Sequence, residues 1–450
     1  MYKLLRRKVD AYLMAWKNNP DRKPLIIKGA RQIGKTRSVE WFAERNYASV
    51  IKINFVEQKQ YQAIFDDGFE VDTIIKNISF LNPENKFIPG ETLFFFDELQ
   101  ACPNCATSLK FFKLDGRYDV ICSGSLMGIS YKEIESNSVG YKEDYEMHSM
   151  DFEEFLWARG YPDDFIDDLY SHMLNVEPFS ALQMDVLMGL FHDYVIVGGM
   201  PEVVDTYINN KNFSGTLAIQ RQLLRDYEED ITKYVEGLDK AKVKAVYNHI
   251  PTFLAKENKR FQITKIAKNA RNRDYIGCVE WLADAGVVNI CYCMDYPELP
   301  LKGNYNPKLY KIYFKDTGLL IASLDEEVQE DLRINKNLGT YKGAIYENIV
   351  GDMLVKQGLR LFYYNSDKPS LEMDFFVRDA SSLVPVEVKA KDGATVSLNN
   401  LLKDDRYPDV KYGVKLGYKN IGFNGKFYTF PYFLTFMLRR FLAERGKGKL

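Results

Sequence analysis

Residues 25–40 read LIIKGARQIGKTRSVE, and this stretch decides the fold of the region around it. It begins with an apolar run, residues 25–27, that is long enough for a buried strand. Residues 29–36 then fit the pattern G-x-x-x-x-G-K-[ST] at every fixed position, and a helical pattern follows with Val39 and Phe42 on one face. A strand, a glycine loop and a helix in this order are the context in which the pattern indicates a phosphate-binding loop.

The loop offers each kind of group that a nucleoside triphosphate needs. Gly29 and Gly34 allow consecutive backbone N–H groups to turn inward, and the following helix N-terminus adds partial positive charge. Lys35 is expected to bind the β- and γ-phosphates, and the Thr36 hydroxyl is expected to bind Mg²⁺. We therefore expect ATP and Mg²⁺ as cofactors; the alternative is an ordinary glycine turn before a helix. The expected nucleotide-binding residues are Gly29, Ala30, Arg31, Gln32, Ile33, Gly34, Lys35, Thr36 and Arg37.

Residues 92–98, TLFFFDE, predict a second part of the same site. An almost wholly apolar strand is typical of a parallel sheet covered on both faces, and ligands bind at the carboxyl ends of such strands. Asp97 is therefore expected to help hold Mg²⁺, and Glu98 to deprotonate a water aimed at the γ-phosphate. A strand ending in Ser123 and Ser125 places two hydroxyls where they can sense that phosphate. The alternative for Asp97 and Glu98 is a strand that ends in a solvent-exposed acidic turn. The alternative for Ser123 and Ser125 is an ordinary turn, in which small residues are common.

Strands and helices alternate through this region. Strands are expected at 49–55 and 118–125 and helices at 72–81 and 105–114, which predicts an α/β nucleotide-binding core from about residue 20 to 150. Before this core, Leu5, Val9, Leu13 and Trp16 form one face of an amphipathic helix.

Bulk properties narrow the class of protein. At about 150 residues per domain, the 450 residues suggest about three domains. The net charge of −2 means that any affinity for nucleic acid must come from a local patch. No apolar run approaches the roughly 18 residues that would span a bilayer, so we expect no membrane contact and a cytoplasmic protein. The six cysteines are expected to be reduced thiols, because Cys102 and Cys105 have no matching pair for a zinc site.

Residues 151–238 are expected to be mostly helical, with a turn at 194–201 and a helix at 221–234 whose charges face solvent. Residues 239–325 read as three helices and an apolar hairpin, which predicts a winged helix. Residues 255–273 contain seven basic residues and only one acidic residue, a composition that favours contacts with DNA phosphates. The alternative is a winged helix that serves only for packing or for binding a protein partner. Those basic residues are Lys256, Lys259, Arg260, Lys265, Lys268, Arg271 and Arg273. Residues 325–337 are charged and loop-like, a boundary to the last domain.

The last domain, residues 326–450, carries a second group of candidate catalytic residues. If the hairpin of strands 371–377 and 384–389 has its centre between Ala380 and Ser381, Asp374 lies opposite Glu387, and Lys389 shares that face. Two opposed carboxylates beside a lysine can hold Mg²⁺ and position a water for phosphodiester attack, with Glu347 as a third acid. The alternative is a hairpin with one charged, solvent-facing side.

These segments together resemble a large bacterial and archaeal family of AAA-type ATPases, whose C-terminal domain of unassigned function is similar to PD-(D/E)xK nucleases. The segments that carry the resemblance are GARQIGKT, FFFDELQ, ICSGS, MDFEEFL, YVIVGGMPEVV, RDYEEDITKY, WLADAGVV, LYKIYFKDTGLL, YKGAIYEN, LEMDFFV and VPVEVKA. The resemblance implies an AAA-type core at 1–150, a helical lid at 151–238, a winged helix at 239–325 and a restriction-endonuclease-like α/β domain at 326–450. It also implies that Lys35, Thr36, Asp97 and Glu98 bind ATP and Mg²⁺, with Ser123 or Ser125 as the first sensor.

The resemblance further assigns Glu347, Asp374, Glu387 and Lys389 to the nuclease-like site. One position departs from the family, since its members usually have Gly-Arg before MDFEEFL, whereas here Gly140 is followed by Tyr141. No arginine finger is therefore assigned.

The sequence thus predicts a Mg²⁺-dependent ATPase whose nucleotide state controls a DNA-directed winged-helix and nuclease-like half. The alternative from another class is an ATP-switched protein-interaction module with a catalytically inactive C-terminal domain. A kinase using the same loop is a third alternative, but Glu98 beside Asp97 favours water activation. DNA, a protein partner and further copies of the chain are the candidate macromolecular partners.

Overall fold

The computed structural model describes residues 5–125, 138–235, 237–254, 274–325, 327–334, 340–366, 371–389 and 395–446, with the single residues 261, 266, 271 and 336. The chain divides into two compact units. The first contains Met1–Ser149 with Asp284–Gly286, and the second contains Met150–Ala283 and Val287–Leu450. Among the described helices, none combines the length and the apolar character needed to cross a membrane.

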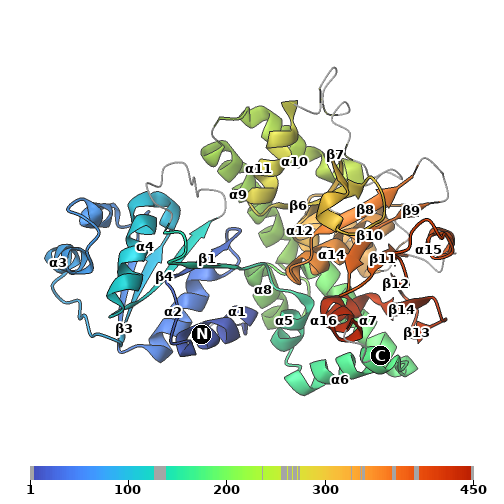
Figure 1. The fold of residues 1–450 in the computed structure, drawn as a ribbon, viewed down its shortest axis with the longest axis horizontal. Helices are drawn as coiled ribbons and strands as arrows, with labels where there is room; N and C mark the ends of the chain where they lie inside the picture. Colours follow the sequence, from blue (N-terminus) through green and yellow to red (C-terminus); the bar gives the residue numbers. More distant parts are fainter. Residues whose placement is uncertain are drawn as a thin grey trace. The chain divides into compact units, whose positions relative to one another are not determined.

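The first unit is built on a five-stranded parallel sheet with the order β2-β3-β4-β1-β5. Figure 1 labels the strands β1, β3 and β4 of this sheet. All six residues of β3 are buried, as expected for a strand covered on both faces. The edge strand β5, which pairs with β1, was not predicted from the sequence because its residues are mostly charged. The strands are β1 Leu25–Gly29, β2 Ser49–Asn54, β3 Thr92–Asp97, β4 Asp119–Ser125 and β5 Glu143–Glu146.

The helices of the first unit confirm the periodicity read from the sequence. Helix α2 begins at the Lys35 of the loop and buries Val39, Phe42 and Ala43. Helices α3 and α4 pack with β2, β3 and β4 around one apolar core. The helices are α1 Lys8–Asn18, α2 Lys35–Asn46, α3 Val71–Leu81 and α4 Pro103–Asp115.

The second unit begins with five helices, which agrees with the mostly helical region predicted from the sequence, but two details differ from the prediction. Helix α7 continues to Val197, so the turn expected at 194–201 is confined to the three residues before α8. The run of apolar residues at the end of α7 is buried, and this burial favours helix over turn. On α9, Asp230 is buried, so the charges there do not all face solvent. The helices are α5 Phe152–Ala158, α6 Asp163–Asn175, α7 Ala181–Val197, α8 Pro201–Asn210 and α9 Thr216–Tyr234.

The apolar hairpin predicted after the helices of residues 239–325 is present as β6 and β7, and it belongs to a larger sheet. Strand β6 pairs antiparallel with β7 and parallel with β8, which gives a sheet with the order β7-β6-β8-β9. The middle helix expected between 255 and 273 falls almost wholly outside the described residues. Residues 325–337, expected to be a loop, contain the helix α13. The elements are α10 Lys240–Leu254, α11 Ile276–Asp284, β6 Val288–Met294, β7 Tyr305–Phe314, α12 Thr317–Ala322, α13 Val328–Arg333, β8 Leu361–Asn365 and β9 Glu372–Met373.

A second five-stranded sheet, with the order β10-β11-β12-β14-β13, completes this unit. Helix α14 contacts β11 of this sheet and also β6, β7 and β8 of its neighbour, so one helix serves both sheets. The remaining elements are α14 Thr340–Lys356, β10 Phe375–Arg378, β11 Leu383–Val388, α15 Val396–Leu401, β12 Gly413–Gly417, β13 Gly422–Phe423, β14 Phe427–Pro431 and α16 Leu438–Arg445.

Two of the motif segments, one containing Gly198 and the other Asp316, pack closely against each other in this unit. The Asp316 carboxylate accepts the backbone N–H of Gly199 at 2.7 Å and caps α12 by accepting from Leu319 N at 3.2 Å. A Cβ on Gly198 would lie 2.1 Å from Asp316 Oδ1, and one on Gly318 would lie 2.5 Å from the Val197 carbonyl oxygen. Side chains at these two glycines would therefore collide with their neighbours.

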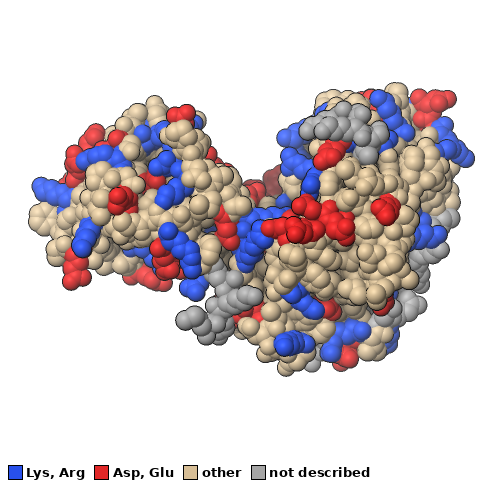
Figure 2. Space-filling model, turned by 90° about the horizontal axis from the view of Figure 1, so that it is seen from below, with Lys and Arg blue, Asp and Glu red and all other residues tan. Residues whose placement is uncertain are grey.

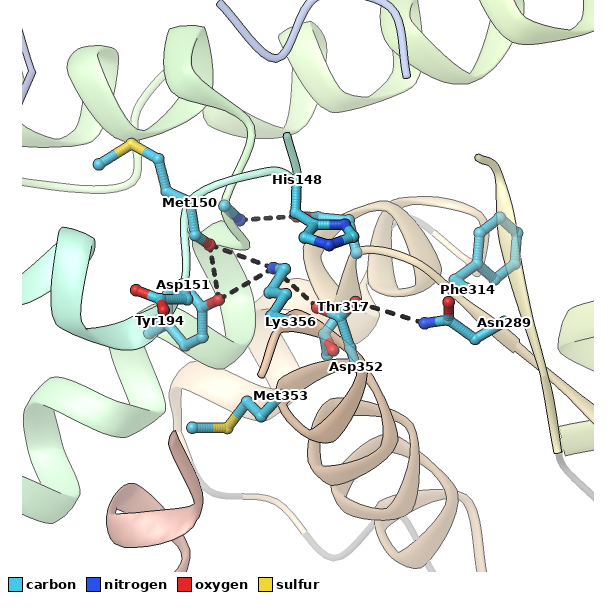
Figure 3. Close-up of polar contacts among 12 residues, drawn as sticks. His148, Met150, Asp151, Tyr194, Asn289, Phe314, Thr317, Asp352, Met353 and Lys356 are labelled. Carbon is cyan, nitrogen blue, oxygen red and sulfur yellow. Dashed lines mark hydrogen bonds and ion pairs between the residues drawn. The ribbon is translucent and has the colours of Figure 1, made fainter. Parts of the chain in front are cut away.

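A buried ion pair fixes the first residue of the second unit (Figure 3). The Lys356 ammonium lies 2.8 Å from Asp352 and donates to the Met150 carbonyl oxygen at 3.1 Å. The Tyr194 hydroxyl donates to the same carbonyl at 2.8 Å. Burial raises the pKa of Asp352 to about 6, and the neighbouring Lys356 works against that rise. The start of the second unit is therefore held to its own helices α7 and α14 by buried, charge-assisted hydrogen bonds.

Candidate nucleotide site and C-terminal carboxylate cluster

The glycine loop has the strained, closely packed backbone that phosphate binding requires. Gly34 has φ 92°, and Gln32 has φ 60°, a left-handed value that non-glycine residues rarely adopt. A Cβ on Gly29 would lie 2.3 Å from the Met147 carbonyl oxygen and 2.4 Å from Cδ1 of Ile33. A glycine is thus needed at position 29 because the segment after β5 lies too close for a side chain. A glycine is favoured at position 34 because its φ is positive.

Lys35 lies at the first position of α2 and folds over its own loop. Its ammonium donates to the carbonyl oxygens of Ala30 at 2.6 Å and Gly29 at 3.1 Å. Burial lowers the pKa of Lys35 to about 8, while the carboxylates of Glu98 and Asp97 oppose that shift.

Asp97 is the centre of the polar site at the end of β3. Its carboxylate accepts from the Thr36 hydroxyl at 3.1 and 3.2 Å, from the Ser123 hydroxyl, and from Asn54 Nδ2 at 3.4 Å. Burial is the main reason that the pKa of Asp97 is raised, and the hydroxyl of Ser123 counteracts it. The structure therefore brings together Thr36, Asp97 and Ser123, three of the residues singled out in the sequence. Hydroxyl and carboxylate oxygens are the protein ligands that Mg²⁺ prefers, so this donor set fits that ion.

Glu98 follows Asp97 in a left-handed conformation with φ 60°. Its carboxylate accepts a hydrogen bond from the side chain of Gln100, whose own carbonyl oxygen accepts the backbone N–H of Ser125 at 3.3 Å. Gln100 thus connects Glu98 to the tip of β4. A backbone held in an unfavourable region at such a place is typical of functional sites.

Sequence reasoning missed Arg7. Its buried guanidinium donates to the carbonyl oxygens of Ile33 and His148, each at 2.7 Å. Arg7 thus ties the glycine loop to the segment after β5, which is 141 residues away in the chain. A basic residue just before an amphipathic helix was the only hint of this role in the sequence.

The C-terminal hairpin has the predicted register, but the strand expected at 371–377 is divided: β9 pairs with β8 of the other sheet, and β10 begins only at Phe375. Phe375 pairs with Val386 and Val377 with Val384, so Asp374 faces Glu387 one position further along. The alternative of a solvent-facing charged side does not hold for Glu387, which is 2% exposed. Its Oε1 lies 2.9 Å from the Lys389 ammonium, and its Oε2 has no hydrogen-bond partner among the described residues.

A residue from β7 joins this cluster. The Lys311 ammonium, 2% exposed, lies 3.1 Å from Oε1 of Glu347 and 3.7 Å from Oε1 of Glu372. The hydroxyl of Tyr313 also donates to Oε1 of Glu347. Burial lowers the pKa of Lys311, but Glu347, Asp374 and Glu372 outweigh it and raise that pKa above its usual range. Sequence reasoning missed Lys311, although a charged residue in an apolar strand was a hint.

On the face drawn in Figure 2, basic and acidic side chains are interspersed on each unit, in keeping with the net charge of −2. Of the seven basic residues expected to contact DNA, only Arg271 belongs to the described residues. All six cysteines are free and buried.

Comparison with protein families divides the chain into three matched segments. The family described as "AAA domain" matches residues 21–156. Two families described as domains of unknown function, DUF8612 and DUF4143, match residues 188–330 and 342–433. No curated protein matches the chain. The match at 21–156, together with the parallel sheet and the glycine loop, defines the first unit as an AAA-type ATP-binding domain of the P-loop class.

Solved structures similar to this chain are distant. A Walker-type ATPase of Pyrococcus abyssi is 14% identical, with a TM-score of 0.42, over 71% of this chain and 96% of that one. The ORC1 protein of Aeropyrum pernix, in complex with DNA, is 11% identical, with a TM-score of 0.32, over 74% and 93%. AMPPCP-bound DnaA of Aquifex aeolicus is 15% identical, with a TM-score of 0.27, over 61% and 86%.

Proposed function

We propose that this chain is a Mg²⁺-dependent ATP hydrolase. The observation that carries the proposal is the convergence of Thr36, Ser123 and Asn54 on the carboxylate of Asp97, next to the glycine loop. Thr36 and Asp97 would hold Mg²⁺, which supplies neutralisation of phosphate charge when bound. The backbone N–H groups of residues 29–37 and the Lys35 ammonium would bind the phosphates.

Glu98 is the proposed general base. Its carboxylate is held by Gln100, and it follows directly the residue assigned to Mg²⁺. A carboxylate in this position can accept a proton from a water that attacks the γ-phosphate, while Ser123 or Ser125 senses that phosphate. The test is phosphate release by wild type, Lys35→Ala and Glu98→Gln. We expect Lys35→Ala to lose binding and Glu98→Gln to bind ATP without turnover; phosphate release by both variants at the wild-type rate would overturn the proposal.

The finer proposal is that the nucleotide state controls the second unit and that this unit is directed to DNA. Support comes from α11 followed by the β6–β7 hairpin and from the seven basic residues between 255 and 273. The test is salt-sensitive DNA binding, and DNA-stimulated phosphate release, by wild type and by a variant with Arg271 and Arg273 replaced by alanine.

The second candidate is an ATP-switched protein-interaction module whose C-terminal domain is catalytically inactive. A specific observation favours it, because the Lys311 ammonium lies among the carboxylates on which a nuclease would depend. Nicking of plasmid DNA with Mg²⁺ or Mn²⁺, lost in Asp374→Ala, would favour the nuclease. No salt-sensitive DNA binding would favour the interaction module.

A further inference from the structure

The C-terminal carboxylate cluster contains a cation of its own. Lys311 comes from β7, outside the hairpin that supplies Asp374 and Glu387, and its side chain is 2% exposed. Its ammonium lies 3.1 Å from Glu347 on α14 and 3.7 Å from Glu372 on β9. One ammonium group therefore contacts carboxylates from two other elements.

The oxygens that a metal would use are largely engaged by protein donors. Oε1 of Glu347 accepts from both Lys311 and Tyr313. Oδ2 of Asp374 accepts the backbone N–H of Val388 at 2.8 Å. Oε1 of Glu387 is paired with Lys389, and its buried Oε2 has no hydrogen-bond partner among the described residues.

This donor set does not fit a Mg²⁺ site. Mg²⁺ prefers near-octahedral oxygen ligands at about 2.0–2.1 Å, but here the positive charge of the Lys311 ammonium already lies against the carboxylates that would supply them. In the described residues, no three His, Cys, Asp or Glu side chains converge closely enough to hold a metal ion. A divalent cation beside Glu347 and Asp374 would also face a buried ammonium in surroundings of low dielectric, where repulsion between like charges is strong.

We propose that Lys311 is the resident cation of this cluster and takes the place that a divalent metal holds in a nuclease. The Lys311 ammonium neutralises Glu347 and, with Lys389 beside Glu387, balances most of the charge of the three acids. The cluster then ties β7 to α14 and β9 without a metal. The C-terminal domain then has the residues of a nuclease-like site with a lysine, in place of a metal, among its carboxylates. This proposal does not depend on ATP hydrolysis by the first unit.

The experiment measures Mn²⁺ binding to the full chain by titration calorimetry, without nucleotide. Wild type and Asp374→Asn are expected to bind the same number of Mn²⁺ ions, because no ion depends on Asp374. Lys311→Met is expected to bind one additional Mn²⁺ per chain, and Asp374→Asn in that background is expected to remove it. A Mn²⁺ ion in wild type that Asp374→Asn removes would overturn the proposal, and so would a folded Lys311→Met variant that gains none.

A second pair of variants covers the case in which Lys311→Met does not fold. Removing one partner leaves a buried charge unpaired, whereas replacing both partners with apolar residues of similar volume is often tolerated. The double variant Lys311→Met, Glu347→Met should therefore recover most of the melting temperature that the single variant loses. A double variant as unstable as the single one would contradict the assignment of Glu347 as the partner of Lys311.

Discussion

Replacing Gly29 by alanine tests how closely the glycine loop depends on the segment after β5. The added Cβ would lie 2.3 Å from the Met147 carbonyl oxygen, whereas ordinary contacts begin at 3.4 Å, so the two backbones must separate by about 1 Å. The Ile33 side chain can rotate away from its own 2.4 Å contact, but Met147 is held by a 2.7 Å hydrogen bond from its N–H to the Lys28 carbonyl.

Overpacking of this kind costs about 1–3 kcal/mol. A domain of this size loses roughly 2–4 °C of melting temperature for each kcal/mol. Nucleotide affinity should fall by about tenfold or more, because each 1.4 kcal/mol lost from the phosphate contacts is a factor of ten. The measurements are thermal unfolding and the dissociation constant of a non-hydrolysable ATP analogue.

The matched control is Gly189→Ala on α7. No atom lies within 4 Å of a Cβ added there, so only helix propensity changes and the variant should gain about 0.5–1 kcal/mol. The close approach at Gly29 would be refuted if Gly29→Ala had the melting temperature and the analogue affinity of wild type. It would also be refuted if Gly29→Ala and Gly189→Ala lowered the melting temperature equally.

Three further predictions follow from the two units. Glu98→Gln should reduce phosphate release by about 10²- to 10⁴-fold while the analogue still binds, and loss of binding with unchanged turnover of bound ATP would contradict its role as base. Burial lowers the pKa of Lys35 to about 8, and only the charged amine binds phosphate well, so the dissociation constant of the analogue should rise as pH increases through 8. Lys35→Arg stays charged and should show no such rise. A dissociation constant of the wild type that does not change from about pH 7 to about pH 9.5 would be inconsistent with this prediction. Lys356→Met leaves Asp352 buried without its cation and should lower the free energy of unfolding, measured with denaturant, by about 3–5 kcal/mol. The control Lys336→Ala breaks the exposed pair with Asp331 and should lower it by at most about 1 kcal/mol. Similar losses in both variants would show that burial of the Asp352 pair does not matter.

Much of the nucleotide site could be predicted from the sequence. The run of phenylalanines before Asp97 becomes a strand buried on both faces, and the register of the C-terminal hairpin places Asp374 opposite Glu387. These features depend on contacts with near neighbours in the chain or on the side-chain alternation of a strand, and local patterns encode both. The turn expected at 194–201 is present but begins only at Gly198, because the apolar residues at the end of α7 are buried and stay helical up to the first glycine.

By itself the sequence determined the chemistry of the glycine loop, the acidic pair that ends β3, and the alternation of strands and helices in the first unit, because short-range spacing specifies them. Only the tertiary structure decided that Arg7 holds that loop and that Lys311 lies among the carboxylates of the last domain. Both side chains reach partners 26 to 141 residues away, and no local period carries information over that distance. The physical reason is that a buried charge must find its partner wherever folding brings one, and the chain's path through the sheets sets that place.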